Sequence, residues 1–80
     1  MKIQLAGSAV KQFKAFPKQV QKKTRKQFGY LLEDFHHPSL NAKKYKGYEG
    51  VWQARIDKQW RFYFHIVEPH YVVVSIITHP

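Results

Sequence analysis

The order of apolar and polar positions predicts a strand and two helices in the first half of the chain. Residues 2–6 alternate between polar and apolar, which is typical of a short strand. Ser8 is a candidate N-cap for a first helix, because its hydroxyl could accept a hydrogen bond from the first helical turn. The apolar positions of this helix are Val10, Phe13 and Phe16.

A second helix is expected to begin at Pro17, because proline suits the first helical turn. Its apolar side consists of Val20, Phe28, Leu31, Leu32 and Phe35, with Thr24 among them. Its opposite side consists of Lys18, Gln21, Lys22, Arg25 and Lys26. The helix should end before His36-His37-Pro38, because a residue that precedes proline avoids the helical region. The two helices would form an antiparallel hairpin.

The second half of the chain predicts four strands. They are expected at residues 43–46, 51–57, 60–67 and 71–79, separated by turns. The last three strands should form an antiparallel meander that packs on the helices. The expected order is therefore β-α-α-β-β-β-β, an α+β fold in which residues 1–80 make one domain.

Alternation along the last three strands assigns even and odd positions to opposite faces of the sheet, because directly opposed residues share a face. The apolar even positions should meet the helices, and they include Trp52, Ala54, Ile56, Trp60, Phe62, Phe64, Ile66, Val72, Val74 and Ile76. The odd face would gather Gln53, Arg55, Arg61, Tyr63, His65 and Ser75, with His79 at its far end. The expected opposed pairs are Asp57 with Arg61, Arg55 with Tyr63, Arg61 with Ile77 and Val67 with Tyr71.

Charge narrows the range of partners. Lys and Arg together number 14 against five Asp and Glu, so the formal net charge is +9 with His neutral. So cationic a domain attracts polyanions, either nucleic acid or an acidic protein. The chain has no cysteine, which excludes disulfides and thiolate metal sites. Its apolar runs are shorter than the roughly 20 residues of a membrane span, and no signal peptide is visible, so a cytoplasmic location is expected.

The odd face suits the binding of phosphate and bases. Guanidinium groups match phosphate oxygens, and aromatic rings accept unstacked bases. Cleavage of RNA through its 2′-hydroxyl needs a base, a cation and an acid, which His, Lys and Arg can supply. No carboxylate pair, serine triad, phosphate loop or zinc motif competes, so no cofactor or metal is expected. The plainer alternative is that Arg61 pairs with Asp57 and that Tyr63 and His65 only cover the sheet.

Several segments resemble the RelE/ParE toxin superfamily. They are His37-Pro38-Ser39-Leu40, residues 43–47, residues 50–56, Trp60-Arg61-Phe62-Tyr63-Phe64 and Ile77-Thr78-His79. The resemblance covers most of the chain and agrees with the expected order of elements. It implies the toxin of a type II toxin–antitoxin system, a metal-independent endoribonuclease that cleaves mRNA at the ribosome. It also implies a cognate antitoxin, and the charge of the chain predicts that this antitoxin is acidic.

The resemblance also assigns roles to individual residues. The implied catalytic residues are Arg55, Arg61, His79 and Tyr63, and the implied RNA-binding residues are Lys43, Lys44, Lys46 and Gln53. Gln53 stands where RelE has a lysine, and no tyrosine follows His79 as in many relatives. His79 and Tyr63 would then carry more of the chemistry, or the activity would be weak or lost. Two alternatives stay open: a non-enzymatic, ParE-like inhibitor of DNA gyrase, and an inactive relative that only binds RNA or antitoxin.

Overall fold

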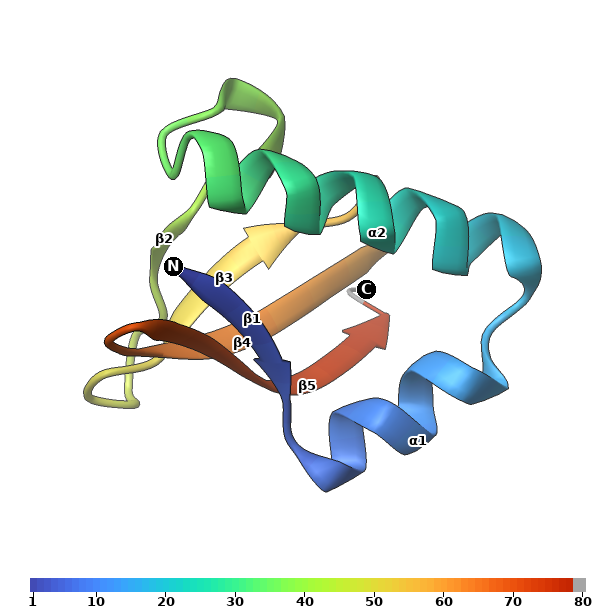
Figure 1. The fold of residues 1–80 in the computed structure, drawn as a ribbon, viewed down its shortest axis with the longest axis horizontal. Coiled ribbons are helices and arrows are strands. Elements are labelled where there is room, and N and C mark those ends of the chain that lie inside the picture. Colours follow the sequence, from blue (N-terminus) through green and yellow to red (C-terminus); the bar gives the residue numbers. More distant parts are fainter. Residues whose placement is uncertain (79–80) are drawn as a thin grey trace.

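A computed structural model describes residues 1–78 and shows two helices packed with a five-stranded sheet (Figure 1). The elements in chain order are β1 (Lys2–Leu5), α1 (Gly7–Ala15), α2 (Lys18–Glu33), the 3-10 helix η1 (Pro38–Leu40), β2 (Lys43–Lys44), β3 (Trp52–Arg55), β4 (Trp60–Val67) and β5 (His70–Thr78). The predicted α+β class and order of elements are confirmed, with η1 as an addition.

The strands form one mixed sheet in the order β1-β5-β4-β3-β2. β2, β3, β4 and β5 pair antiparallel with their neighbours, which confirms the predicted meander. β1 lies at the other edge and runs parallel to β5. The first and last strands of the chain are therefore adjacent in space.

The register between β3 and β4 differs from the prediction by two residues. Arg55 lies opposite Arg61, so the expected pairing of Asp57 with Arg61 and of Arg55 with Tyr63 is wrong. The carboxylate of Asp57 explains the difference, because its Oδ1 accepts hydrogen bonds from the backbone of Gln59 at 2.8 Å and of Trp60 at 2.9 Å. These bonds hold Asp57 in the turn rather than in the ladder. A shift of two residues keeps every side chain on its predicted face.

A β-bulge changes the register between β4 and β5. Arg61 lies opposite Ile77 as predicted, but the register shifts between Tyr63 and Phe64, and Val67 then lies opposite His70 rather than Tyr71. The pairing of Tyr63 with Ser75 and of Phe64 with Val73 leaves Val74 as the extra residue. An extra residue in one strand reverses the faces of the residues beyond it.

The bulge corrects the predicted core of β5. Val73 and Tyr71 are buried in the core, whereas Val72 and Val74 are only half-buried, so the predicted inward set of Val72, Val74 and Ile76 holds for Ile76 alone. Strict alternation failed here because the bulge sits inside the strand.

α1 completes the edge of β5 that β1 leaves unpaired. β1 pairs with β5 only as far as Val73. Beyond it, Ser8 Oγ donates to the carbonyl of Val74 at 2.9 Å, and Gln12 Oε1 accepts from the backbone N–H of Ile76 at 2.8 Å. Ser8 is therefore not the N-cap. That position is Ala6, which offers no side-chain cap.

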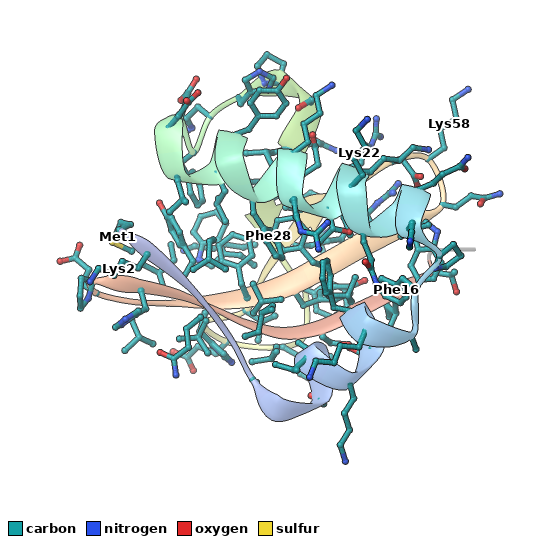
Figure 2. All side chains as sticks on the ribbon, turned by 45° about the vertical axis from the view of Figure 1, so that its right-hand side comes forward. Met1, Lys2, Phe16, Lys22, Phe28 and Lys58 are labelled. Atoms are coloured by element: carbon teal, nitrogen blue, oxygen red, sulfur yellow. The ribbon has the colours of Figure 1, made fainter. Side chains whose placement is uncertain are left out.

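α2 lies along one face of the sheet and packs on the core (Figure 1). Phe62 and Phe64 of β4 are fully buried, and the ring of Phe28 meets that of Phe62 edge-on at 5.1 Å. Figure 2 shows Phe28 between α2 and the sheet, with Lys22 pointing away from it. Leu32, predicted for the apolar side, is 45% exposed. Neither helix of residues 1–78 is both long and apolar enough to cross a membrane.

Both tryptophans pack against the core rather than standing free on the surface. The rings of Phe16 and Trp60 lie 4.5 Å apart, and those of Phe35 and Trp52 lie 5.1 Å apart. Edge-on and tilted aromatic pairs of this kind bury much area per residue. A chain of 80 residues without disulfides can thereby close its core.

Gln27 connects α2 to β3, the strand that ends at Arg55. Its side chain is 5% exposed, and Nε2 donates to the carbonyl of Arg55 at 2.9 Å and to that of Ser39 at 3.3 Å. One buried amide therefore joins α2, η1 and the end of β3. No buried side-chain polar atom within residues 1–78 lacks a partner.

We expect Gln27→Leu to lower the free energy of unfolding by about 1–3 kcal/mol, because the partly buried carbonyls of Ser39 and Arg55 would lose their donor. Urea denaturation followed by circular dichroism measures the change. Gln19→Leu is the matched control, since Gln19 is exposed on the same helix. Equal stability of the two variants would contradict the role of Gln27.

Candidate functional site

The face of the sheet that points away from α2 carries the polar residues predicted for it, and we call it the outer face. The register places Lys43, Gln53, Tyr63 and Ser75 side by side across four strands. Arg55 and Arg61 form the next row, and His65 lies two residues beyond Tyr63 along β4. The structure therefore brings together the predicted odd-face residues of β3, β4 and β5. Their chemical roles stay predictions.

Arg55 and Arg61 face one another on adjacent strands, and neither has an acidic partner within residues 1–78. Arg61 is held in place because its Nη1 donates to the carbonyls of Asp57 and Trp60, at 3.0 Å for Trp60. Arg55 is exposed. The one ion pair among residues 1–78 joins Lys23 Nζ to Asp57 Oδ2 at 3.2 Å. The alternative in which the Asp57 carboxylate neutralises Arg61 is therefore wrong, and both guanidinium groups can receive an anion.

Asp57 organises the turn next to these arginines. Burial raises the pKa of its carboxyl, but the hydrogen bonds from the backbone of Gln59 and Trp60 and the charge of Lys23 lower it, and the pKa ends below its ordinary value. The carboxylate is therefore more stable in the folded protein than in the unfolded chain. Its charge helps to hold the turn whose carbonyl binds Arg61.

Tyr63 lies between the arginine row and the loop that follows β2. It is only 8% exposed. Burial raises the pKa of its phenol, the nearby Tyr45 raises it further, and Arg61 opposes the shift. The phenol therefore stays protonated near neutral pH. It can donate a hydrogen bond to an anion on the outer face but is not a base there.

The predicted RNA-binding lysines divide between two sides of the sheet edge. Lys43 lies opposite Gln53 and shares the outer face. Lys44 lies opposite Trp52, with its Nζ 6.0 Å from the centre of that ring, so it faces the other side. Lys46 is exposed in the following loop. His79 lies outside the described residues.

The loop after β2 contains two tyrosines that the sequence analysis did not single out. The ring of Tyr45 meets Tyr63 edge-on at 4.9 Å, and Tyr48 stacks on Tyr45 at 5.4 Å with planes 11° apart. A hollow of about 560 Å³ lies beside them, lined by Lys44, Tyr45, Gly47, Tyr48, Glu49, Gly50 and Trp52. The signal that could have found it is the Tyr45-x-x-Tyr48 spacing around a glycine.

Residues 1–78 offer no obvious ligand set for a metal ion, since no three of their His, Asp and Glu side chains cluster. The adjacent His36 and His37 make different contacts. His37 stacks on Tyr30 at 3.8 Å, and its Nδ1 accepts from the backbone of Ser39 at 3.2 Å. His36 is exposed.

This arrangement of two helices and a mixed sheet is similar to the folds of several toxins whose structures have been solved. The YoeB dimer from Staphylococcus aureus matches with a TM-score of 0.84 and 19% identity, over 100% of this chain and 98% of that chain. The YoeB/ParE toxin from Agrobacterium tumefaciens matches with a TM-score of 0.83 and 16% identity, over 100% of both chains. YafQ from E. coli strain BL21(DE3) matches with a TM-score of 0.77 and 13% identity, over 96% of this chain and 91% of that chain.

The resemblance read from the sequence is thus confirmed at the level of the fold. No family model and no curated protein matches the sequence. The likeness to the toxins is carried by the three-dimensional arrangement, at identities of 12–19%.

We expect Asp57→Asn to destabilise the protein at neutral pH. The difference in stability between the unaltered protein and the variant should become smaller as the pH falls. The folded-state pKa of Asp57 is depressed, so its contribution is present above the ordinary value of 3.8 and is lost as the pH drops through the folded value. Unfolding midpoints of both proteins at pH 7 and near pH 2 measure this. A constant difference between them would contradict the assigned charge effect.

Proposed function

We propose that the chain is the toxin of a type II toxin–antitoxin system and acts as an endoribonuclease on mRNA at the ribosome. The observation that carries the proposal is the opposed pair of Arg55 and Arg61 on the outer face, without an acidic partner within residues 1–78. The shared fold with YoeB, YafQ and RelE supports the same assignment.

The arginine pair suits the cleavage of a phosphodiester by its own 2′-oxygen. That oxygen attacks the adjacent phosphorus, a 2′,3′-cyclic phosphate forms, and the bond to the 5′-oxygen of the next nucleotide breaks. Negative charge builds on the non-bridging oxygens during the attack. Two guanidinium groups aimed at those oxygens stabilise the transition state more than the ground state.

Two protons move in this reaction, one from the 2′-hydroxyl and one to the leaving 5′-oxygen. Arginine stays protonated and serves as a donor only. We assign the first transfer to His79, whose imidazole would accept the proton of the 2′-hydroxyl as the general base. We assign the second to Tyr63, which keeps its phenolic proton because burial raises its pKa and would give that proton to the leaving 5′-oxygen. Proton exchange with water then restores both side chains. No metal ion is required in this scheme, because the arginines supply the positive charge.

The remaining predicted residues would position the RNA strand. Lys43 and Lys46 would contact phosphates, and Lys44 would do so from the opposite side of the sheet edge. Gln53 is 9% exposed and lies between Lys43 and Tyr63, where its amide can reach a 2′-hydroxyl or a base edge. These contacts bind the strand, whereas the arginines act on the phosphate.

The proposed partner is an antitoxin with an acidic segment that covers the outer face. YoeB, YafQ and RelE were solved in complexes with YefM, DinJ and RelB. The net charge of +9 and the unneutralised arginines favour a partner rich in Glu and Asp.

We expect Arg61→Ala to reduce RNA cleavage by about 100-fold or more, because one donor to the developing charge is lost. Arg55→Ala should reduce it to a similar degree. Mapping of 5′ ends after induced expression measures cleavage in translating cells. Lys14→Ala, an exposed cation at the end of α1, is the control and should cleave normally. Uncut mRNA in cells that arrest through blocked supercoiling would instead identify a gyrase inhibitor.

We expect the affinity for an acidic antitoxin segment to fall as salt rises, because screening weakens the charge pairing. Arg55→Ala should weaken binding further, whereas Lys14→Ala should leave it nearly unchanged. Calorimetric titrations at low and physiological ionic strength test both points. An antitoxin that binds Arg55→Ala as tightly as the unaltered chain would show that it covers another face.

A further inference from the structure

We propose that the loop after β2 is a subsite for one unpaired nucleobase of the RNA strand, with Tyr48 as the stacking surface and Glu49 as the group that favours guanine. This subsite deepens the proposed function and rests on it for the identity of the ligand as RNA. It lies beside the arginine pair rather than within it.

The loop has a fixed conformation that presents its side chains in advance. The backbone N–H of Tyr48 donates to the carbonyl of Tyr45 at 3.4 Å, and that of Val51 donates to Tyr48 at 3.2 Å. Gly47 and Gly50 have φ values of 90° and 76°, a region that favours glycine. The sequence thus builds two successive turns around Tyr48.

A hydrogen-bonding contact of 3.0 Å between Nδ1 of His65 and the carbonyl of Gly50 ties the end of this loop to β4. A loop held at both ends loses little freedom when a ligand binds.

The tyrosines form a stack that is open on one side. Tyr45 packs edge-on against Tyr63 and face-on against Tyr48, so the three rings lead from the outer face into the loop. Tyr48 ends this series and is 63% exposed. An exposed aromatic face at the end of a rigid stack is the surface on which unstacked bases of single-stranded RNA bind.

The subsite and the arginine pair lie at different positions along β4. His65, which anchors the loop, lies four residues from Arg61, which is about 13 Å at the rise of a strand. A base on Tyr48 and a phosphate between the arginines therefore belong to different nucleotides of one strand. Lys44 lines the hollow and Lys46 is exposed in the same loop, so both can attract the phosphates that flank a base bound there.

Glu49 selects the part of the nucleotide that enters the hollow. It is the one acidic residue among those that line the hollow. A carboxylate repels phosphate and accepts two hydrogen bonds, so it favours a base edge that carries donors. Guanine offers two adjacent donor groups on its Watson–Crick edge, the N1–H and the N2 amino group. Adenine, cytosine and uracil each offer a single donor group on that edge. Guanine should therefore bind best.

The test uses RNA pentamers with 2′-O-methyl groups, which cannot be cleaved because their 2′-oxygens carry no proton and cannot attack. The centre of each pentamer is guanine, adenine, uracil or an abasic residue, and the four flanking residues are abasic, so that only the central base can stack. Binding to the full chain is followed by chemical shifts of the Gly47 and Gly50 amides. The guanine pentamer should bind most tightly, and the abasic one about tenfold or more weakly, since stacking would be lost.

Three variants separate stacking from edge recognition. Tyr48→Leu should weaken binding of every pentamer that has a central base by about tenfold, whereas Tyr48→Phe keeps the ring and should bind normally. Glu49→Gln should reduce the preference for guanine and leave uracil binding nearly unchanged. Circular dichroism should show that all three are folded, because both side chains are exposed.

Equal binding of the guanine and abasic pentamers, or normal binding by Tyr48→Leu, would overturn the subsite. The subsite would also be overturned if the loop bound none of the pentamers but bound a tryptophan-containing acidic peptide, because its ligand would then be a protein. The readout does not depend on cleavage. Guanine-selective binding without cleavage in cells would support the subsite and refute the nuclease. Normal cleavage and normal pentamer binding by Tyr48→Leu would refute the subsite and leave the nuclease supported.

Discussion

The alternation of side chains along β4 is the constraint on which both the core and the outer face depend. Phe62 and Phe64 enter the core, and Arg61 and Tyr63 must then lie on the opposite side. The tight burial of the two phenylalanines fixes the register, because a slip by one residue would bury a guanidinium group. The hydrophobic core thereby sets the position of the cations that receive the anion.

The bulge in β5 lets one strand satisfy two different neighbours. On one side of Val74, β5 pairs with β1, and on the other its edge is satisfied by side chains of α1. Gln12 and Ser8 supply the hydrogen bonds that an added strand would otherwise supply. The short β1 is thus sufficient to complete this edge of the sheet, because α1 lies beside β5 and satisfies the rest of it.

The sequence predicted the elements and the two faces of β3 and of the first half of β4 well, since both follow from periodicity. It could not predict the bulge at Val74, because the run of β-branched residues in β5 does not mark an inserted residue. It also missed the turn built by Asp57, because a turn that is longer by two residues keeps the same faces. On the outer face it found the arginines from their strand positions. It missed the tyrosine stack, because loops carry no period and only the fold brings Tyr45 onto Tyr63.

The brevity of β2 has a consequence for how the protein behaves at high concentration. This edge of the sheet ends in two residues, both lysines and both exposed. Long, uncharged edges recruit strands from other molecules and lead to aggregation, whereas short edges that carry charge resist it. A second copy that approached with its own lysines would meet electrostatic repulsion before any backbone could pair. The same two cations therefore keep the sheet from growing outward into a fibre.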